Sequence, residues 1–278
     1  MKRKFGHIVA LLLLIQGFQH ICSQGNLLVA PIRVVFEDGK QREDLNLSNI
    51  GQDTAVYLIS FLHYQMIEDG SFKQLNDSVE LPTPRADKYL RIFPRRVTLP
   101  PGESQIVRLQ YRKQAGQEDG EYRSHLYFRA DKNATPLGMR AVGEDSTRLS
   151  VSITPIFGIS IPIIIRTGNL DLGLSLSDVS LKAVNDSLYT LGVSINRTGL
   201  KSSYGSLEAT FVPNKGEQIK VGIANGVGIY TELSKRVYNL PIRLSKGIKL
   251  QNGKIIIRYL TPKDDGGKEL AKIEYPIP

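Results

Sequence analysis

The sequence predicts an all-β protein built from two β-sandwich domains. Short stretches of alternating apolar and polar residues fill most of the chain, turn-forming residues separate them, and helical periodicity is not apparent over any long window. One stretch is exceptionally long, because every odd-numbered position from Leu149 to Ile165 is apolar and most even positions up to Ser160 are small or polar. Alternation with a period of two places such a row on one sheet face. The segment predicts a strand about three times the usual length.

The first half of the chain contains about seven predicted strands, a number and spacing typical of a sandwich. Pro100, Pro101 and Gly102 predict a tight turn, because proline presets φ and glycine accepts a positive φ. Two polar, irregular stretches, 65–88 and 131–148, are expected to be loops. The predicted strands read LLVAPIRVVF, LNLSN, AVYLISFLHY, YLRIFPRRVTL, SQIVRLQYR, EYRSHLYFRA and then the long alternating stretch.

The pattern restarts with weaker hydrophobicity after Thr167, which predicts a second sandwich of about seven strands. Asp264, Asp265, Gly266 and Gly267 predict a hairpin turn between its last two strands. The boundary therefore falls near residue 167, which gives domains 24–167 and 168–278. The second set of strands reads LDLGLSLSDVSLKAV, SLYTLGVSINRTG, GSLEATFVP, EQIKVGIA, RVYNLPIRL, GKIIIRYLTP and ELAKIEYPI.

Residues 1–23 have the pattern of a secretory signal peptide. Lys2–Lys4 precede an apolar run from Ile8 to Ile15, which is too short to span a bilayer as a helix. The only cysteine, Cys22, is either a lipidated first residue or is discarded with the signal. We favour the second interpretation, because Ile21 is a poor fit to the small residue that lipoprotein processing prefers. A soluble exported protein is expected.

The sequence offers no constellation of residues that predicts an enzyme or a cofactor site. His63 and His125 lie on two predicted strands and the other two histidines lie in the signal segment, so a metal cluster is not expected. No GxSxG turn appears, and the glycine-rich stretches lack the partners of phosphate or dinucleotide loops. The formal net charge of +9 falls to +6 without Lys2, Arg3 and Lys4. The remaining cations are scattered through strand-like stretches, which favours a solvated surface over nucleic-acid binding.

The arrangement of segments resembles the periplasmic pilus chaperones of the PapD-like type. APIRVVFEDG resembles the family's first strand with its arginine, here Arg33, and LNLSNIGQDTAVYLISF resembles the next two strands. FPRRVTLPPGESQIVRL is similar to the D to E segment, EYRSHLYFRA to the F strand, and ISIPIIIRTG to the end of the G strand and the hinge. The resemblance covers residues 27–168, while the second half fits by size and pattern. It implies two immunoglobulin-like β-sandwich domains joined at a hinge in an L or boomerang shape.

The resemblance also implies a function. In this family the G strand lends alternating apolar residues to a fimbrial (pilus) subunit whose own sandwich lacks its last strand, and the complex is delivered to an outer-membrane usher. An added strand supplies main-chain hydrogen bonds and side chains for alternate pockets. Each large aliphatic side chain buried in this way contributes about 1.5–3 kcal/mol. The residues expected to fill the groove are Leu149, Val151, Ile153, Pro155 and Phe157, and Ile159–Ile165 are expected to belong to the protein's own core.

A charged anchor is the second implied element. The family holds the subunit's C-terminal carboxylate in the cleft between the domains with an arginine of the first strand and a lysine of the G strand. Arg33 matches the arginine, but Pro162 stands at the lysine position. Arg166 is the nearest candidate for the second cation. The exposed G strand would also allow two copies of the chain to associate.

Two alternatives belong to other functional classes. An exported structural protein or adhesin with the same two sandwiches predicts that the long strand is fully paired inside its own sheet. A secreted hydrolase predicts that His63 or His125 lies beside a nucleophile and a carboxylate in a cleft.

Overall fold

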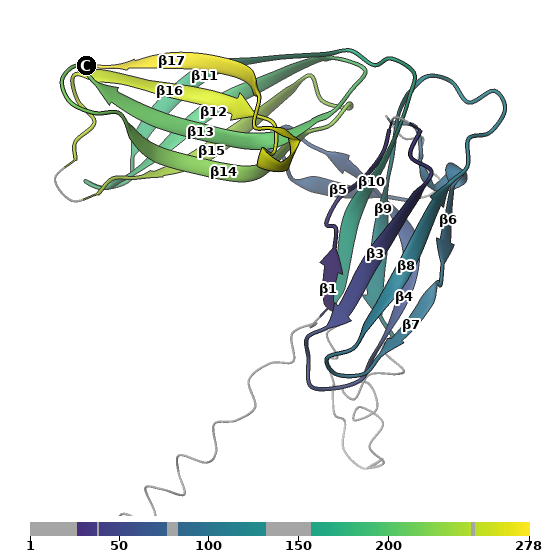
Figure 1. The fold of residues 1–278 in the computed structure, drawn as a ribbon. Coiled ribbons are helices and arrows are strands. Elements are labelled where there is room, and N and C mark those ends of the chain that lie inside the picture. Colours follow the sequence, from purple (N-terminus) through teal and green to yellow (C-terminus); the bar gives the residue numbers. More distant parts are fainter. Residues whose placement is uncertain (1–26, 38, 77–82, 132–156, 246–247) are drawn as a thin grey trace, which may run out of the picture.

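The computed structural model describes residues 27–37, 39–76, 83–131, 157–245 and 248–278. The prediction of an all-β fold is confirmed, because the regular elements in these ranges are strands apart from two short 3-10 helices, Asp87–Tyr89 and Lys263–Asp265. None of the described segments forms a helix long and apolar enough to cross a membrane. Figure 1 shows two elongated sandwiches that meet at one end and form an L.

The first sandwich packs two sheets face to face. One has the strand order β1-β3-β8-β6 and the other β2-β10-β9-β4-β5, with β7 paired to β4. The strands are β1 (Leu27–Ala30), β2 (Val34–Phe36), β3 (Arg42–Asn49), β4 (Ala55–Met66), β5 (Phe72–Leu75), β6 (Leu90–Phe93), β7 (Arg96–Leu99), β8 (Ser104–Tyr111), β9 (Gly120–Ala130) and β10 (Gly158–Thr167).

Prolines divide two of the stretches that were predicted as single strands. LLVAPIRVVF forms β1 and β2, with Pro31 between them, and YLRIFPRRVTL forms β6 and β7, with Pro94 between them. In each case the two halves belong to opposite sheets. Proline has no backbone N–H to donate to a ladder, so it stands where the chain leaves one sheet and enters the other.

The prediction of a loop over 65–88 was partly wrong. Phe72–Leu75 form β5, which pairs with the end of β4 and extends that sheet toward the second sandwich (Figure 1). The strand is short and mostly exposed, so its sequence carries no alternation that would have revealed it.

The apolar row of β10 enters the core of the first sandwich, as predicted. Ile161, Ile163 and Ile165 are at most 3% exposed, and Ile159 packs against the same cluster. Ile164 points to the other face and is also buried, in a small cluster with Met66 of β4 and Tyr230 of the second sandwich. One strand therefore contributes to the first core and to the junction between the sandwiches.

The second sandwich contains the seven strands that the sequence predicts. Its sheets have the orders β11-β12-β15 and β14-β13-β16-β17. The predicted hairpin turn is present, with φ of +89° at Gly266 and +59° at Gly267 between the antiparallel β16 and β17. The strands are β11 (Leu172–Ala183), β12 (Leu188–Gly199), β13 (Ser203–Pro213), β14 (Ile219–Ile229), β15 (Lys235–Arg243), β16 (Gly253–Leu260) and β17 (Glu269–Ile277).

A buried ion pair joins the two sandwiches. Arg123 of β9 donates from Nη2 to Oε1 of Glu232 at 2.6 Å and from Nη1 to Oε2 at 2.9 Å. The side chains are 3% and 0% exposed. Arg123 also donates to the carbonyl of Tyr64, and Glu232 accepts the backbone N–H of Met66. Both charges are therefore satisfied by groups that come from different sandwiches.

We predict that Arg123→Ala lowers the free energy of unfolding by about 3–5 kcal/mol, because it leaves the Glu232 carboxylate buried without its cation. Urea unfolding of the full chain measures this change. Arg91→Ala is the control, since Arg91 is an exposed arginine on β6. A loss no larger than that of the control would contradict the prediction.

Candidate binding cleft between the two sandwiches

A cleft of about 530 Å³ lies between the sandwiches, at the N-terminal end of β2. Segments far apart in the sequence form its walls. The first sandwich contributes the residues before β2 and parts of β4, β5, β9 and β10, and the second contributes parts of β13, β14 and β15 and the turn after β14. The residues that line it include Ile32, Arg33, Tyr64, Met66, Phe72, His125, Ser160 and Pro162 of the first sandwich and Tyr204, Tyr230 and Arg236 of the second.

Aromatic rings hold the guanidinium of Arg33 in this cleft. Its Cζ lies 4.6 Å from the ring centroid of Tyr204 and 5.7 Å from that of Tyr230, and Nη1 donates to the Tyr230 hydroxyl at 3.2 Å. Within the described ranges Arg33 has no carboxylate partner. A cation held by aromatic faces keeps hydrogen-bond donors for a further group. The prediction that Arg33 binds a chain-terminal carboxylate stays a prediction.

Pro162 is the neighbour of Arg33 on the adjacent strand. β10 and β2 are parallel, with Ile163 opposite Val34, so the preceding residues of the two strands also lie side by side. Pro162 and Arg33 both line the cleft. Because proline is uncharged, β10 contributes no cation at this place.

One turn of the second sandwich positions both Tyr230, which lines the cleft, and Glu232, which pairs with Arg123. Tyr230 and Glu232 lie between β14 and β15, and Arg197 of β12 donates to the carbonyls of Thr231 at 2.8 Å and Leu233 at 2.9 Å. The turn is thereby tied to its own sandwich while Tyr230 faces both Arg33 and Arg123, whose Cζ lies 3.9 Å from the ring centroid. Tyr230 of the second sandwich thus contacts two arginines of the first.

The floor of the cleft is aromatic and uncharged. His125 of β9 packs edge-on against Tyr64 at 4.9 Å and against Phe72 at 5.7 Å between ring centroids. Burial, reinforced by the positive charges of Arg123, His63 and Arg33, lowers the pKa of His125 to about 3. The imidazole is neutral near pH 7, so the lining charges of the cleft are those of arginines.

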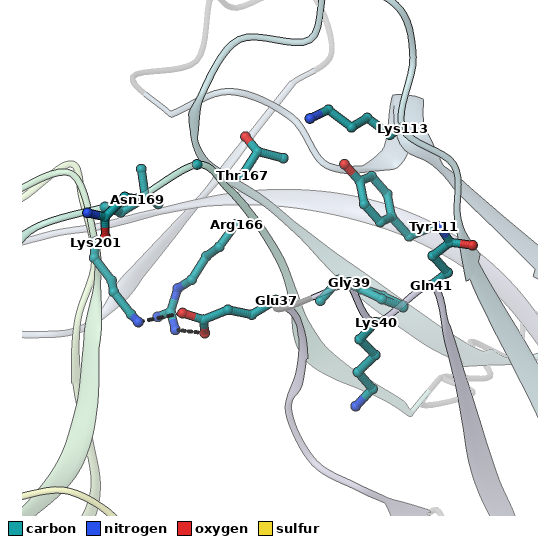
Figure 2. A pocket seen from close by; sticks show the side chains of 13 residues that line it. Glu37, Gly39, Lys40, Gln41, Tyr111, Lys113, Arg166, Thr167, Asn169 and Lys201 are labelled. Carbon is teal, nitrogen blue, oxygen red and sulfur yellow. Dashed lines mark hydrogen bonds and ion pairs between the residues drawn. The ribbon is translucent and has the colours of Figure 1, made fainter.

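The second residue predicted as an anchor, Arg166, lies in a different pocket at the other end of β2, with a volume of about 420 Å³. Its guanidinium donates to Glu121 at 2.9 Å, to Glu37 at 2.8 Å and to the carbonyl of Ser202 at 3.0 Å. Figure 2 shows Glu37 reaching both Arg166 and Lys201. An anchoring role for Arg166 stays a prediction. To bind a subunit's carboxylate, Arg166 would have to give up one of these hydrogen bonds.

Glu37 is held as a carboxylate in that pocket. Burial alone would raise its pKa, but hydrogen bonds from Lys201 and Arg166 outweigh burial and lower the pKa below its ordinary value. Because Lys201 belongs to the second sandwich and Arg166 to the first, the carboxylate bridges the hinge.

Most of the predicted groove-filling residues cannot be placed. Leu149, Val151, Ile153 and Pro155 lie outside the described residues. Phe157 is described: it precedes β10, its carbonyl accepts the N–H of Ala130 at 3.1 Å, and the residue is 42% exposed. Its role as a groove-filling residue remains untested.

Among the described strands, one edge of β10 is only partly paired beside the cleft. β10 pairs with β9 from Gly158 to Thr167, but β2 covers its other edge only from Ile163 to Ile165. Among the described strands, none pairs with Gly158–Pro162 on that side. The backbone groups there are available to an added strand.

The hydrolase alternative gains no support from the histidines. His63 Nε2 lies 3.8 Å from Asp87 Oδ2, and the Ser124 hydroxyl lies 3.4 Å from Asp87 Oδ1. The carboxylate therefore stands between the serine and the histidine. Ser124 also accepts the N–H groups of Ala86 and Asp87, and both Ser124 and His63 are buried. No three His, Cys, Asp or Glu side chains gather to hold a metal ion within the described ranges.

Sequence reasoning missed the residues that the second sandwich brings to the cleft. Tyr204, Tyr230 and Arg236 stand 171, 197 and 203 positions after Arg33. They lie in stretches whose alternation predicts only strands and turns. No local motif marks them, because their proximity to Arg33 arises from the angle between the sandwiches.

Comparison with known proteins gives structural likenesses only. No family model matches the chain, and no curated protein matches it. Among solved structures, the chain resembles the YadV chaperone with 11% identity, 90% of this chain and 98% of that chain covered, and a TM-score of 0.44.

Two complexes contain further similar chains. One is the CsuC–CsuE chaperone–tip adhesion subunit complex of Acinetobacter baumannii, with 14% identity, coverage of 89% and 97%, and a TM-score of 0.43. The other is the Salmonella enterica SafA pilin in complex with the SafB chaperone, with 14% identity, coverage of 92% and 99%, and a TM-score of 0.41.

We predict that His125 makes stability depend on pH. Because its pKa is about 3 in the folded chain and about 6.5 when unfolded, the unfolded chain binds more protons below pH 6.5, and stability falls as the pH drops from 6.5 toward 3. His125→Phe keeps an aromatic ring at this position and removes the imidazole that binds the proton. Thermal unfolding midpoints of the variant should fall less than those of the wild type over this window. Parallel pH profiles would contradict the prediction.

Proposed function

We propose that this protein is a periplasmic chaperone that binds fimbrial or pilus subunits by lending them a strand and delivers them to an outer-membrane usher. The observation that carries the proposal is the open edge of β10 at Gly158–Pro162, which leads directly to the Arg33 cleft. The activity would use no nucleotide, metal or other cofactor. It would not be an enzymatic reaction.

The open edge supports strand addition on physical grounds. A partner strand alongside Gly158–Pro162 would find unpaired N–H and C=O groups on β10, which give affinity through main-chain hydrogen bonds. The opposite edge of β10 is fixed by ten residues of β9, from Gly120 to Arg129. The strand would therefore present a rigid template to the subunit.

Side chains before β10 would supply specificity. We propose that Leu149, Val151, Ile153, Pro155 and Phe157 fill the apolar groove of an incomplete subunit sandwich, continuing the row that Ile159–Ile165 place in the protein's own core. Phe157, the described member of this set, has the exposure that such a role requires.

The charged part of the proposal assigns the subunit's C-terminal carboxylate to Arg33. The guanidinium is half-buried, is fixed by Tyr204 and Tyr230, and meets no carboxylate among the described side chains. Arginine is suited to carboxylates because its planar donors can bind both oxygens. Arg33 would thus fix the register of the bound subunit.

Export and delivery rest on other features. The signal-peptide pattern of residues 1–23 supports a periplasmic location. The usher as recipient follows from the resemblance of segments 27–168 to the PapD-like family. Without a subunit, the same open edge would allow two copies of the chain to pair.

The structural or adhesin alternative is less favoured. It predicts that the long strand is paired on both edges inside its own sheet. Within the described part of the chain, β2 covers only Ile163–Ile165 of β10.

The test is recovery of a subunit from the periplasm. The full chain is co-expressed with the small secreted proteins encoded beside its gene, and the complex is isolated through the chaperone. We predict that Arg33→Glu, and separately Ile153→Asp with Phe157→Asp, abolish recovery of the subunit. The first reverses the charge that would meet the carboxylate, and the second places charges in an apolar groove.

Matched variants on the other sheet serve as controls. Arg91→Glu reverses an exposed arginine of β6, and Ile106→Asp charges an exposed isoleucine of β8. Both should recover the subunit as the wild type does. Undiminished recovery with Arg33→Glu and with the double variant would overturn the proposal.

A further inference from the structure

We infer that Arg236 of β15 is the second cation of the Arg33 cleft, so that the carboxylate at the end of a bound chain is held between guanidinium groups of both sandwiches. This inference rests on the function proposed above for the identity of the bound chain. It assigns to the second sandwich a direct part in holding the subunit.

The charge of the cleft is unbalanced. Arg33 and Arg236 both line it, and the set of lining residues contains no Asp or Glu. The neighbouring carboxylate is Asp69, in the turn between β4 and β5, and its Oδ1 accepts the N–H of Ser71 at 2.8 Å. The Asp69 charge acts on Arg236 without a hydrogen bond in the described contacts. An anion that enters the cleft would meet two cations.

The guanidinium of Arg236 is incompletely satisfied. Nη1 donates to the carbonyl of Gly228, while Nε is buried and has no hydrogen-bond partner among the described groups. Burial lowers the pKa of Arg236, and the neighbouring tyrosines and Asp69 offset this effect only in part. A buried polar group without a partner is costly. A bound carboxylate would place a negative charge beside the guanidinium and accept hydrogen bonds from those of its N–H groups that face the cleft.

The backbone of the turn between β4 and β5 packs closely against this guanidinium. Gly70, also in the turn between β4 and β5, has a φ of +86°, and a Cβ there would collide with the Arg236 side chain. On the other side the Cζ of Arg236 lies 5.4 Å from the ring centroid of Tyr238. The first sandwich thus accommodates a cation that the second provides.

Strand pairing explains why a chain end should reach this place. A partner strand along the open edge of β10 can extend only to Pro162, because Val34 of β2 already pairs with Ile163. A strand that runs parallel to β10 would therefore end beside Arg33, the residue before Val34. Its terminal carboxylate would fall in the cleft that Arg236 lines.

The first experiment needs no subunit. The full chain is titrated with sodium acetate at constant ionic strength, and with acetamide as the uncharged probe. Binding is followed by tyrosine fluorescence, since the chain has 12 tyrosines and no tryptophan. We expect acetate to bind in preference to acetamide. Arg236→Met and Arg33→Met should each weaken acetate binding about ten-fold or more, because each removes charge-assisted hydrogen bonds.

The control and a second variant keep the result interpretable. Arg243→Met replaces an exposed arginine on the same strand and should bind acetate as the wild type does. Arg236→Lys keeps the charge but loses the forked donors, so it should bind with intermediate affinity. Thermal unfolding of each variant shows that it is folded. Wild-type affinity in Arg236→Met, or equal binding of acetate and acetamide to the wild type, would overturn the inference.

The second experiment repeats the subunit recovery with Arg236→Met. Loss of recovery with Arg236→Met but not with Arg243→Met is expected. If the wild type recovers the subunit and Arg236→Met does so equally well, the inference fails and the proposed function stands. If the wild type binds acetate but recovers no subunit, the proposed function fails. The cleft would then bind a carboxylate that does not belong to a subunit's C-terminus.

Discussion

The buried contact between Arg123 and Glu232 sets the relation of the two sandwiches, and the cleft depends on that relation. The side chain of Glu232 is fully buried and accepts hydrogen bonds from Arg123, from the backbone of Met66 and from Thr83, all in the first sandwich. Buried charges are stable only when their partners are in place. The turn that carries Glu232 also carries Tyr230, so the same contact positions one wall of the cleft.

A second constraint is the short length of β2. β2 pairs with only three residues of β10, those nearest the second sandwich, and no other described strand pairs with Gly158–Pro162 on that edge. Arg33 precedes β2 and therefore stands where the open edge ends. The register between β2 and β10 therefore places the partly paired edge of β10, Arg33 and the second sandwich close together. Strand addition and charge recognition would operate together.

The sequence was sufficient to predict both sandwiches and the inner half of the long strand, since period-two alternation depends on burial in the strand's own sheet. The division of strands between sheets at Pro31 and Pro94 was missed, although the buried positions change from odd to even numbers across Pro31 and from even to odd across Pro94. Arg33 was predicted as an anchor because the segment around it resembles the first strand of the PapD-like family, and this role stays a prediction. Arg236 could not be found in this way, because its position in the cleft depends on the packing of two domains.

Hydrogen–deuterium exchange of the full chain, alone and in complex with its subunit, tests the central claim that the open edge of β10 is the binding surface. The account predicts that amides in the segment Gly158–Ile161 exchange more slowly in the complex, because an added strand bonds them, while exchange in β8 is unchanged. A stable complex in which this segment exchanges as fast as in the free chain would contradict the account.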